Sequence, residues 1–251
     1  GELMEKKNIE KKVAFIGSGI SALGSAYFLD DIYDIRIFEK NNKFGGHSNT
    51  VEVNIYDKKI SVDTGFIVYN ESNYPNLTKF FEILDVPANW SDMSFGFSKS
   101  NGRLEYACDN LNKIFCQRSN IVNPNFLKGI LEILRFNKQG SNLDISSLNS
   151  DYTLGSFLKD NKYNQWFKNN FILPMGAAVW STPIEKMLDF PIKNFLLFFR
   201  NHDLLNGLSP SKRWKTVEGG SKIYVDKIIK KIAGKAKSNY EVVNVKRTKN
   251  K

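Results

Sequence analysis

The sequence contains little of the chemistry that metal centres and thiol-dependent sites require. Among its 251 residues there are only two cysteines, Cys108 and Cys116, and two histidines, His47 and His202. The cysteines form no CxxC pair and have no histidine nearby, so their spacing suits neither a zinc site nor a thioredoxin-like pair. Two histidines also exclude a multi-histidine metal centre. We therefore predict no metal site, and we expect both cysteines to be buried apolar fillers.

Long apolar runs are missing as well. No stretch approaches the roughly 20 apolar residues that a transmembrane helix needs. The start of the chain, Gly1 to Met4 followed by charged residues, lacks the apolar core of a signal peptide. We therefore expect no membrane span and a location in the cytoplasm.

Acidic residues are outnumbered, with 26 Asp and Glu against 36 Lys and Arg and a net charge of +10. Such a charge is typical of proteins that contact nucleic acid or an anionic membrane surface, or of a biased genomic composition. The lysines are scattered, often beside asparagine as at 40–43 and 168–170, and form no basic-aromatic strip. The pattern favours a solvated face over nucleic-acid binding. A hydrophobic content of 41% supports a packed core.

Residues 11–40 carry a strand–helix–strand pattern. The apolar run at 13–16 is too short for a helix and stops at Gly17, which indicates a buried parallel strand. Residues 21–30 place apolar side chains at helical spacing, and 35–38 read as a second strand. This order predicts a βαβ unit with a crossover helix.

The turn between this strand and helix carries a candidate phosphate-binding motif. Residues 17–22 read GSGISA, a GxGxxA sequence. Gly17 permits a tight turn, Gly19 lets a pyrophosphate approach the backbone, and the small Ala22 lets helix and strand pack closely. The helix N-terminus supplies free N–H donors for a diphosphate. Glu39 ends the second strand, where it can accept hydrogen bonds from ribose hydroxyls. A dinucleotide site is favoured over a glycine turn without a ligand.

A glycine pair, Gly45-Gly46, follows shortly after Glu39 and begins the string GGHSNT at 45–50. It would bring a second backbone segment close to the same crevice, which a plain NAD domain does not need. The chain resembles the flavin-containing amine oxidase superfamily, where the fingerprint is followed by a GGRxxT- or GGHxxT-like motif. The superfamily includes monoamine and polyamine oxidases, protoporphyrinogen oxidase and carotenoid desaturases. The resemblance implies FAD as the cofactor and disfavours NAD. His47 stands where Arg is commoner, which removes a fixed positive charge near the phosphates.

The resemblance extends over nearly the whole chain. VDTGF at 62–66 resembles a block near the flavin, in which Asp63 is expected to fix the loop structurally. WKTVEGG at 214–220 resembles the point where the chain re-enters the FAD domain. The apolar alternation at 242–245 predicts a further strand, and the resemblance implies that its backbone lies near the adenine with Val243 as the contact.

The strings at 63–70 and 73–77 resemble one bacterial branch whose members are described as predicted NAD/FAD-binding proteins. The predicted fold class is α/β: a Rossmann-like FAD-binding domain with a mostly helical substrate-domain insertion. The FAD-binding domain is discontinuous at 11–75 and 210–251, and the substrate or cap domain covers 76–209. Full-length relatives continue with a second flavin contact, so we expect the C-terminal portion of the family fold to be missing.

The sequence pattern predicts two hairpins, one long loop and seven helices outside the βαβ unit. Hairpins are predicted at 51–62 and 95–106, a loop at 139–150, and helices at 75–84, 125–136, 154–160, 163–171, 185–189, 191–202 and 223–233. The predicted cofactor-binding residues are Gly17, Gly19, Ile20, Ser21, Ala22, Glu39, Lys40, Gly45, Gly46, His47, Ser48, Gly65 and Val243. No catalytic residue can be named.

The resemblance implies an FAD-dependent oxidoreductase, in which a hydride equivalent leaves a substrate C–H for flavin N5. A lipid-like or unsaturated small molecule is the preferred substrate, because the insertion is rich in phenylalanine and because of the branch resemblance. An amine oxidase and a non-catalytic, truncated FAD-binding module are the alternatives. The apolar stretch at 195–199 is expected to be core, with a tunnel lining or a peripheral membrane contact left open.

Overall fold

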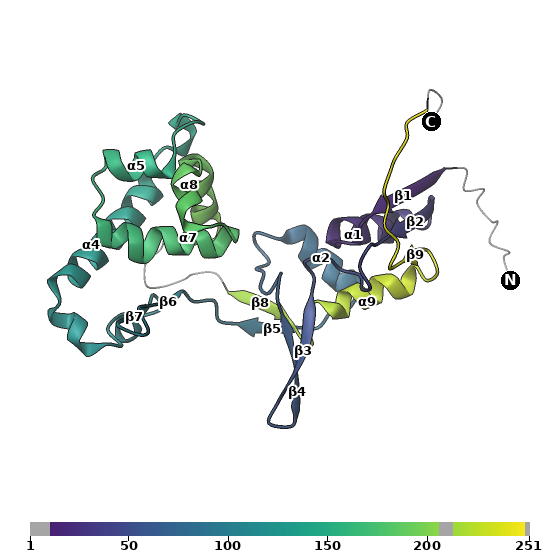
Figure 1. The fold of residues 1–251 in the computed structure, drawn as a ribbon, viewed down its shortest axis with the longest axis horizontal. Coiled ribbons are helices and arrows are strands. Elements are labelled where there is room, and N and C mark those ends of the chain that lie inside the picture. The colour runs from purple at the N-terminus through teal and green to yellow at the C-terminus, as the bar shows by residue number, and fades with distance from the viewer. Residues whose placement is uncertain (1–10, 206–212, 249–251) are drawn as a thin grey trace. The chain divides into compact units, whose positions relative to one another are not determined.

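The computed structural model describes residues 11–205 and 213–248, which divide into two compact units (Figure 1). Over the described residues, unit 1 comprises residues 11–91 and 214–248, and unit 2 comprises residues 92–205 and 213. The first residues, on which the expectation of no signal peptide rests, lie outside the described part, as does the end of the basic tail. No helix within the described ranges is both long enough and apolar enough to cross a membrane.

Unit 2 begins at Asp92, whereas the sequence placed the boundary after residue 75. The reason is helix α2 (Pro75–Ile83), which opens with a proline in its first turn. Phe80 and Phe81 of this helix are buried in the same core cluster as Leu23. Because that core is the core of unit 1, α2 is part of the nucleotide-binding side of the chain.

The parallel sheet of unit 1 confirms the predicted βαβ unit. It has the order β1–β2–β9, from β1 (Lys12–Ile16), β2 (Asp34–Phe38) and β9 (Ala236–Lys237), with α1 (Ile20–Leu29) between the first two. Ile35 and Ile37 of β2 are fully buried, as are Leu23 and Ala26 of α1. β1 is less buried than expected, since it lies at an edge of the described sheet and Ile16 is 62% exposed.

The remaining strands of unit 1 form two antiparallel pairs. They are the hairpin of β3 (Thr50–Ile55) and β4 (Lys58–Asp63), and the pair of β5 (Ala88–Ser91) with β8 (Trp214–Val217). The hairpin was predicted, and it turns at Tyr56 and Asp57, both with positive φ. Helix α9 (Lys222–Lys231) follows β8 as the sequence indicated and packs against α1.

The strand predicted at 242–245 is wrong. The strand that joins the sheet is β9, because Gly234 at φ +80° turns the chain directly after α9. Backbone bonds from Ile37 N–H to the Lys235 carbonyl (2.9 Å) and from Tyr240 N–H to the Glu39 carbonyl (2.8 Å) then bind this segment beside β2. The apolar alternation further on reflects exposed side chains, and Val243 is 88% exposed.

Unit 2 is mostly helical, as predicted. It contains the hairpin β6 (Gly96–Lys99) and β7 (Leu104–Ala107), α3 (Leu111–Ile114), α4 (Pro124–Asn142), α5 (Leu154–Asp160), α6 (Gln165–Phe167), α7 (Leu173–Trp180), α8 (Ile192–Asn201), 3-10 turns at Arg118–Val122, Ile145–Ser147 and Ile184–Asp189, and a π-helical turn at Lys168–Ile172. Helix α4 runs past the predicted end at 136 into the expected loop.

The core of unit 2 is aromatic. Phe136 of α4 meets Phe195 and Phe199 of α8, and all three are fully buried. The 195–199 stretch therefore packs as core, the interpretation that the sequence favoured. Cys108 is partly buried beside this core, whereas Cys116 is exposed, so the expectation of two buried cysteines is wrong for Cys116.

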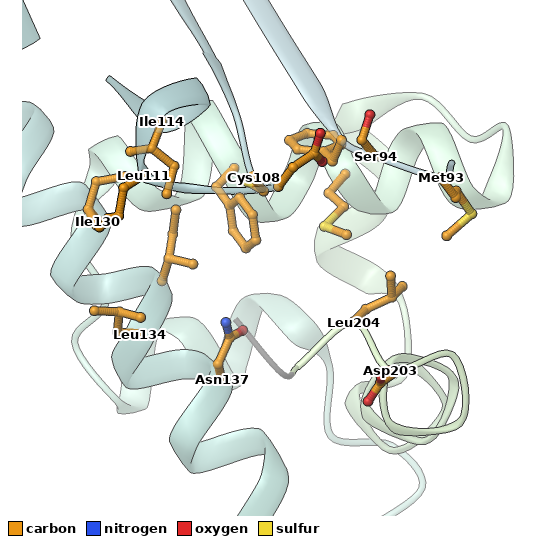
Figure 2. A pocket seen from close by; sticks show the side chains of 15 residues that line it. Met93, Ser94, Cys108, Leu111, Ile114, Ile130, Leu134, Asn137, Asp203 and Leu204 are labelled. Atoms are coloured by element: carbon orange, nitrogen blue, oxygen red, sulfur yellow. The ribbon is translucent and has the colours of Figure 1, made fainter. Parts of the chain in front are cut away.

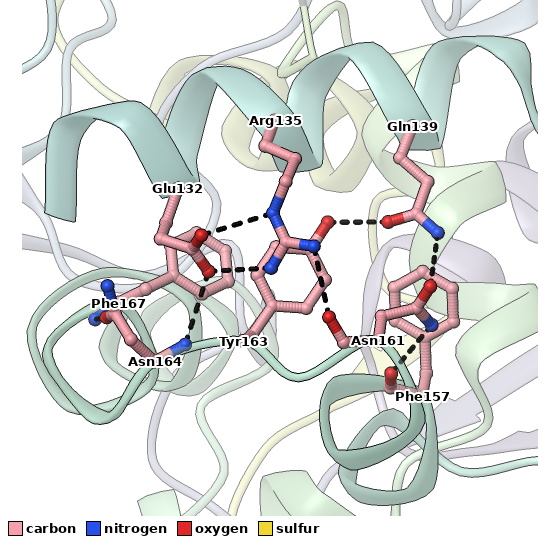
Figure 3. A network of polar contacts seen from close by, with 8 residues as sticks. All are labelled: Glu132, Arg135, Gln139, Phe157, Asn161, Tyr163, Asn164 and Phe167. Atoms are coloured by element: carbon pink, nitrogen blue, oxygen red, sulfur yellow. Dashed lines mark hydrogen bonds and ion pairs between the residues drawn. The ribbon is translucent and has the colours of Figure 1, made fainter. Parts of the chain in front are cut away.

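A polar network fixes helix α4 against the turn after α5 (Figure 3). Arg135 pairs with Glu132 through Nε (3.1 Å) and Nη2 (2.8 Å), and its guanidinium lies 3.9 Å from the centre of the Tyr163 ring. Gln139 accepts from the Tyr163 hydroxyl at 2.6 Å and donates to Asn161 at 2.6 Å. These α4 side chains recur at helical spacing on one face, whereas Ile133, Phe136 and Asn137 are buried on another face of the helix.

Candidate functional site

The loop between β1 and α1 ends in an uncovered helix N-terminus. Gly17 has φ +91°, a conformation that favours glycine, and its N–H donates to the Phe38 carbonyl at 2.8 Å. Gly19 is the N-cap of α1 and supplies no side-chain cap, and the first helical bond is Leu23 N–H to the Gly19 carbonyl at 3.0 Å. The first-turn N–H groups of α1 precede that bond and have no acceptor within the helix. No acidic residue lies in this turn, so the positive end of the helix is not neutralised.

Glycine at two positions of this loop leaves open space. A Cβ atom built at Gly17 or Gly19 would meet no other atom within 4 Å. Gly19 has φ −64° and ψ 169°, which any residue can adopt. The absence of a side chain at Gly19 is therefore not needed for packing or backbone geometry among the described residues. An open surface of this kind suits a group that approaches the backbone from outside.

Glu39 closes one side of the loop at the end of β2. Its Oε2 accepts from the Ser18 N–H at 2.9 Å and from the Ser18 hydroxyl at 2.6 Å, and its Oε1 accepts from the Asn41 N–H at 2.9 Å. The residue is 5% exposed. Burial alone would raise the pKa of Glu39, but these hydrogen bonds outweigh it and hold the pKa below the usual value. The carboxylate is thus ionised at neutral pH.

The second glycine segment lies directly against the phosphate loop. Gly45 and Gly19 form a parallel bridge, and the Gly45 N–H donates to the Ser18 carbonyl at 3.0 Å. A Cβ atom at Gly46 would stand 3.1 Å from the Gly19 Cα, and one at Gly45 would stand 2.5 Å from the Ser48 carbonyl oxygen. Both glycines also have positive φ. Glycine at 46 therefore permits the close approach to Gly19, whereas glycine at 45 permits the tight turn within the 45–48 segment.

The block around Asp63 connects this segment to α9. Asp63 accepts from the Thr50 hydroxyl at 2.6 Å and from the Ser221 N–H at 2.9 Å, which fixes the start of α9. A Cβ atom at Gly65 would stand 2.1 Å from the His47 carbonyl oxygen, so the loop after β4 packs directly on His47. The structural role expected of Asp63 is confirmed by these contacts.

Helix α9 supplies a wall of the site. The Tyr224 hydroxyl donates to Ser48 Oγ at 2.7 Å, and burial raises the pKa of Tyr224, so its hydroxyl stays protonated. Tyr224 is 1% exposed and stacks beside Phe81 of α2. Helix α9 therefore fixes the position of the 45–48 segment through the contact of Tyr224 with Ser48.

These elements enclose a cavity of about 510 Å³ within unit 1. Of the predicted cofactor-binding residues, eight line it: Gly17, Gly19, Ile20, Ser21, Ala22, Gly45, His47 and Ser48. The predicted residues that do not line it are Glu39, Lys40, Gly46, Gly65 and Val243. Glu39, Gly46 and Gly65 support the loops that do, as described above, whereas Lys40 is exposed.

Four lining residues were not predicted as site residues: Ile16, Phe66, Leu77 and Tyr224. Ile16 directly precedes Gly17, and Phe66 directly follows Gly65. Both could have been predicted as site residues, because each is adjacent in sequence to a predicted one. Leu77 and Tyr224 lie on α2 and α9, far along the chain from the glycine motifs. Nothing local in their sequence distinguishes them from core residues.

Comparisons with known proteins give the same assignment of fold. Residues 16–84 match the model of the NAD(P)-binding Rossmann-like domain family. No curated protein sequence matches the chain. A triple mutant of putrescine oxidase, redesigned in cofactor binding, shares 13% identity at a TM-score of 0.58, covering 91% of this chain and 50% of its own. Cyclohexylamine oxidase from Brevibacterium oxydans IH-35A shares 14% at 0.59, covering 91% and 51%. The CLA-producing fatty acid isomerase from P. acnes shares 14% at 0.54, covering 92% and 52%.

Unit 1 thus has a Rossmann-like fold, and unit 2 is a mostly helical insertion in the chain. The chain shares its fold with part of the solved putrescine oxidase and cyclohexylamine oxidase structures, and it spans about half the length of the solved structures that it matches. The predicted fold class is confirmed.

Proposed function

We propose that unit 1 binds FAD and that the chain serves an FAD-dependent oxidoreductase. The observation that carries this proposal is the cavity in which the uncovered N-terminus of α1 and the Gly45 segment meet beside Glu39. A cavity of about 510 Å³ lies within the range typical of small-molecule and cofactor sites.

The residues present fit a dinucleotide. The first-turn N–H groups of Ile20, Ser21 and Ala22 would hold the diphosphate, where the helix dipole favours negative charge. A carboxylate offers about four acceptor positions, and Ser18 and Asn41 each approach Glu39 with a backbone N–H and a side chain. A ribose hydroxyl would therefore take the place of the Asn41 side chain. The open space at Gly19 provides room for the diphosphate at the backbone.

FAD is preferred to NAD because of the second glycine segment. Gly45 to Ser48 are held against the phosphate loop by the bridge to Gly19 and by Tyr224. This construction adds a second wall of backbone to the crevice, and the solved structures of the same fold are amine oxidases and a fatty acid isomerase. Val243 lies outside the sheet, and the strand that was predicted at 242–245 is not formed. The adenine contact proposed for Val243 therefore lacks the strand on which the prediction was based.

Bound FAD would supply the chemistry, as acceptor of a hydride equivalent at N5. The chain's own residues would bind and orient it: backbone donors at the phosphates, Glu39 at the ribose, and Phe66 and Tyr224 as walls of the cavity. No side chain in this cavity stands out as a general base. His47 lines the cavity but is exposed, and its carbonyl serves the loop by accepting from the Phe66 N–H at 3.2 Å.

The substrate proposed is a lipid-like or unsaturated organic molecule. One protein of the same fold is named as a fatty acid isomerase, which supports an apolar substrate. The phenylalanines of the insertion form the packed core of unit 2 and do not bear on this choice. An amine is the alternative, favoured by the putrescine oxidase and cyclohexylamine oxidase of the same fold. We place the protein in the cytoplasm, without a nucleic-acid partner.

Equilibrium titration of the purified protein tests the proposal. FAD, followed by flavin fluorescence and visible absorption, should bind, and NAD at the same concentrations should not displace it. A protein that binds NAD and leaves FAD free would overturn the assignment. In the flavin-loaded protein, anaerobic bleaching by an unsaturated long-chain substrate, but not by benzylamine or a polyamine, supports the proposed substrate. Rapid bleaching by an amine would reverse that ranking.

A further inference from the structure

Unit 2 encloses a second, smaller cavity of about 150 Å³, lined entirely by its own residues (Figure 2). Most of the lining is apolar, including Ile114, Ile130, Leu134, Phe171 and Met175. The cavity lies among helix α4, the segment between β7 and α3, and the start of α7. An apolar cavity of this volume is large enough for a six-membered carbon ring, since engineered cavities of about 150 Å³ bind benzene.

One buried polar group in this wall lacks a partner. Asn137 of α4 is 7% exposed, and its Oδ1 forms no hydrogen bond with any residue that the structure describes. Figure 2 shows its amide directed into the cavity, across from Ser94. An unpaired acceptor in a buried position is unfavourable and rare, because it has lost its hydrogen bonds to water. A donor within the cavity would satisfy it.

The other polar groups of the wall do not supply that donor. Asp109 forms an ion pair with Lys113, and as a carboxylate it accepts rather than donates. Burial, together with the charge of Asp109, raises the pKa of the Cys108 thiol to about 12, so the thiol stays protonated. Neither this weak S–H donor nor the Ser94 hydroxyl forms a hydrogen bond with Asn137 Oδ1.

We propose that this cavity binds a small apolar molecule, about the size of a six-membered ring, whose single hydroxyl or N–H group donates to Asn137 Oδ1. The apolar lining accommodates the ring, and the amide selects the polar group. Asp109 and Asp203 both line the cavity, so an anionic ligand such as a carboxylate is disfavoured. The ligand class is therefore a neutral alcohol, a phenol or an aromatic amine. This site goes beyond the proposed flavin function and does not depend on FAD binding in unit 1.

Phenol and toluene are suitable probes, because they share a shape and differ by a hydroxyl in place of a methyl group. Their dissociation constants are to be measured by ligand-observed NMR on the 251-residue protein, on Asn137→Leu and on Asn142→Leu. Asn142 is an exposed asparagine of the same helix and serves as the matched control. The ratio of the toluene constant to the phenol constant should fall about tenfold or more in Asn137→Leu. It should stay unchanged in Asn142→Leu, and benzoate should not bind.

Failure of both probes to bind the unaltered protein would overturn the proposal. So would a ratio of the toluene to the phenol dissociation constant in Asn137→Leu that equals the ratio in the unaltered protein. A second measurement requires no change at Asn137. In Cys116→Ser, which removes the exposed thiol, phenol should slow the alkylation of Cys108 by N-ethylmaleimide in proportion to its occupancy. An alkylation rate that is independent of phenol would also contradict the site.

Discussion

Glu39 and Ser18 fasten the end of β2 to the phosphate loop: one carboxylate oxygen accepts both the N–H and the hydroxyl of Ser18, at 2.9 and 2.6 Å. The proposed ribose ligand is therefore also the residue that shapes the loop. A substitution of Glu39 should therefore change both the stability of the fold and the affinity for the ligand. A substitution of a residue that only contacts the ligand should change the affinity alone.

In Glu39→Gln an NH2 group replaces one carboxylate oxygen and faces the N–H or hydroxyl donor from which that oxygen accepted. We expect binding of ADP to weaken about ten- to a hundredfold, since a hydrogen bond to a charged group contributes roughly 1.5–3 kcal/mol. The melting temperature should fall as well. Calorimetric titration and thermal unfolding measure both effects, and Glu82→Gln on the exposed face of α2 is the control. An unchanged ADP affinity would remove Glu39 from the site.

The lowered pKa of Glu39 also predicts a pH dependence. A carboxylate with a pKa below its unfolded value stabilises the folded state above that value, and this contribution is lost as the pH falls through the folded pKa. Urea unfolding between about pH 6 and 3 should show this loss. In Glu39→Gln that part of the acid destabilisation should disappear. Identical acid profiles for both proteins would contradict the assigned cause.

ADP should bind this chain nearly as tightly as FAD does. The backbone groups that line the cavity would hold the diphosphate and adenosine side of the cofactor, whereas Phe66 and Leu77 add only a small apolar wall. We expect the two dissociation constants to agree within about tenfold, a difference of about 1.4 kcal/mol. Little turnover should follow, because the flavin ring would remain accessible to water. A preference for FAD above about a hundredfold would show that this chain also holds the isoalloxazine ring.

Tyr163 makes unit 2 sensitive to alkali. Burial raises its pKa to about 12, and the residue is 3% exposed. A raised folded pKa gives stability that is full below the unfolded value of about 10 and is lost as the pH rises toward 12. The free energy of unfolding from urea titrations should therefore fall between pH 10 and 12 by about 2 kcal/mol. Tyr163→Phe should flatten this decline, and an unchanged slope would contradict the assignment.

Two glycines test the packing of the helices. A Cβ atom at Gly129 of α4 would stand 2.0 Å from the Trp166 ring, so Gly129→Ala should destabilise the protein by about 1–3 kcal/mol or more. At Gly24 of α1 the nearest atom is Phe80 Cε1 at 3.7 Å, an ordinary contact. Gly24→Ala should be neutral or stabilising by up to about 1 kcal/mol. Equal effects in urea unfolding would show that α4 packs differently.

The sequence revealed the elements whose signals are local. The βαβ unit, the hairpin at 51–62 and the helix after Gly220 each show a short apolar period bounded by turn residues, and all three are present. The glycine motifs also revealed that two backbone segments meet, because the lack of a side chain at Gly46 permits the close approach to Gly19.

Features that depend on tertiary contacts could not be found this way. The alternation at 242–245 predicted a strand, but pairing along β2 is already made by β9. Leu77 and Tyr224 enter the site from helices whose orientation only the packed core decides. In the sequence, Asn137 cannot be told apart from any other asparagine of an amphipathic helix. Its unpaired Oδ1 can be recognised only from the positions of the neighbouring residues in the fold.

The most direct measurement is the FAD affinity of Gly19→Val beside that of Gly24→Ala. Gly19 has an ordinary backbone conformation and open space around it, so a side chain there should not disturb the free protein and should stand where the diphosphate approaches. Without ligand, the account predicts an unchanged melting temperature in Gly19→Val and an unchanged or higher one in Gly24→Ala. FAD binding should be lost in Gly19→Val and unaltered in Gly24→Ala. FAD binding by Gly19→Val with the affinity of the unaltered protein would contradict the proposed site.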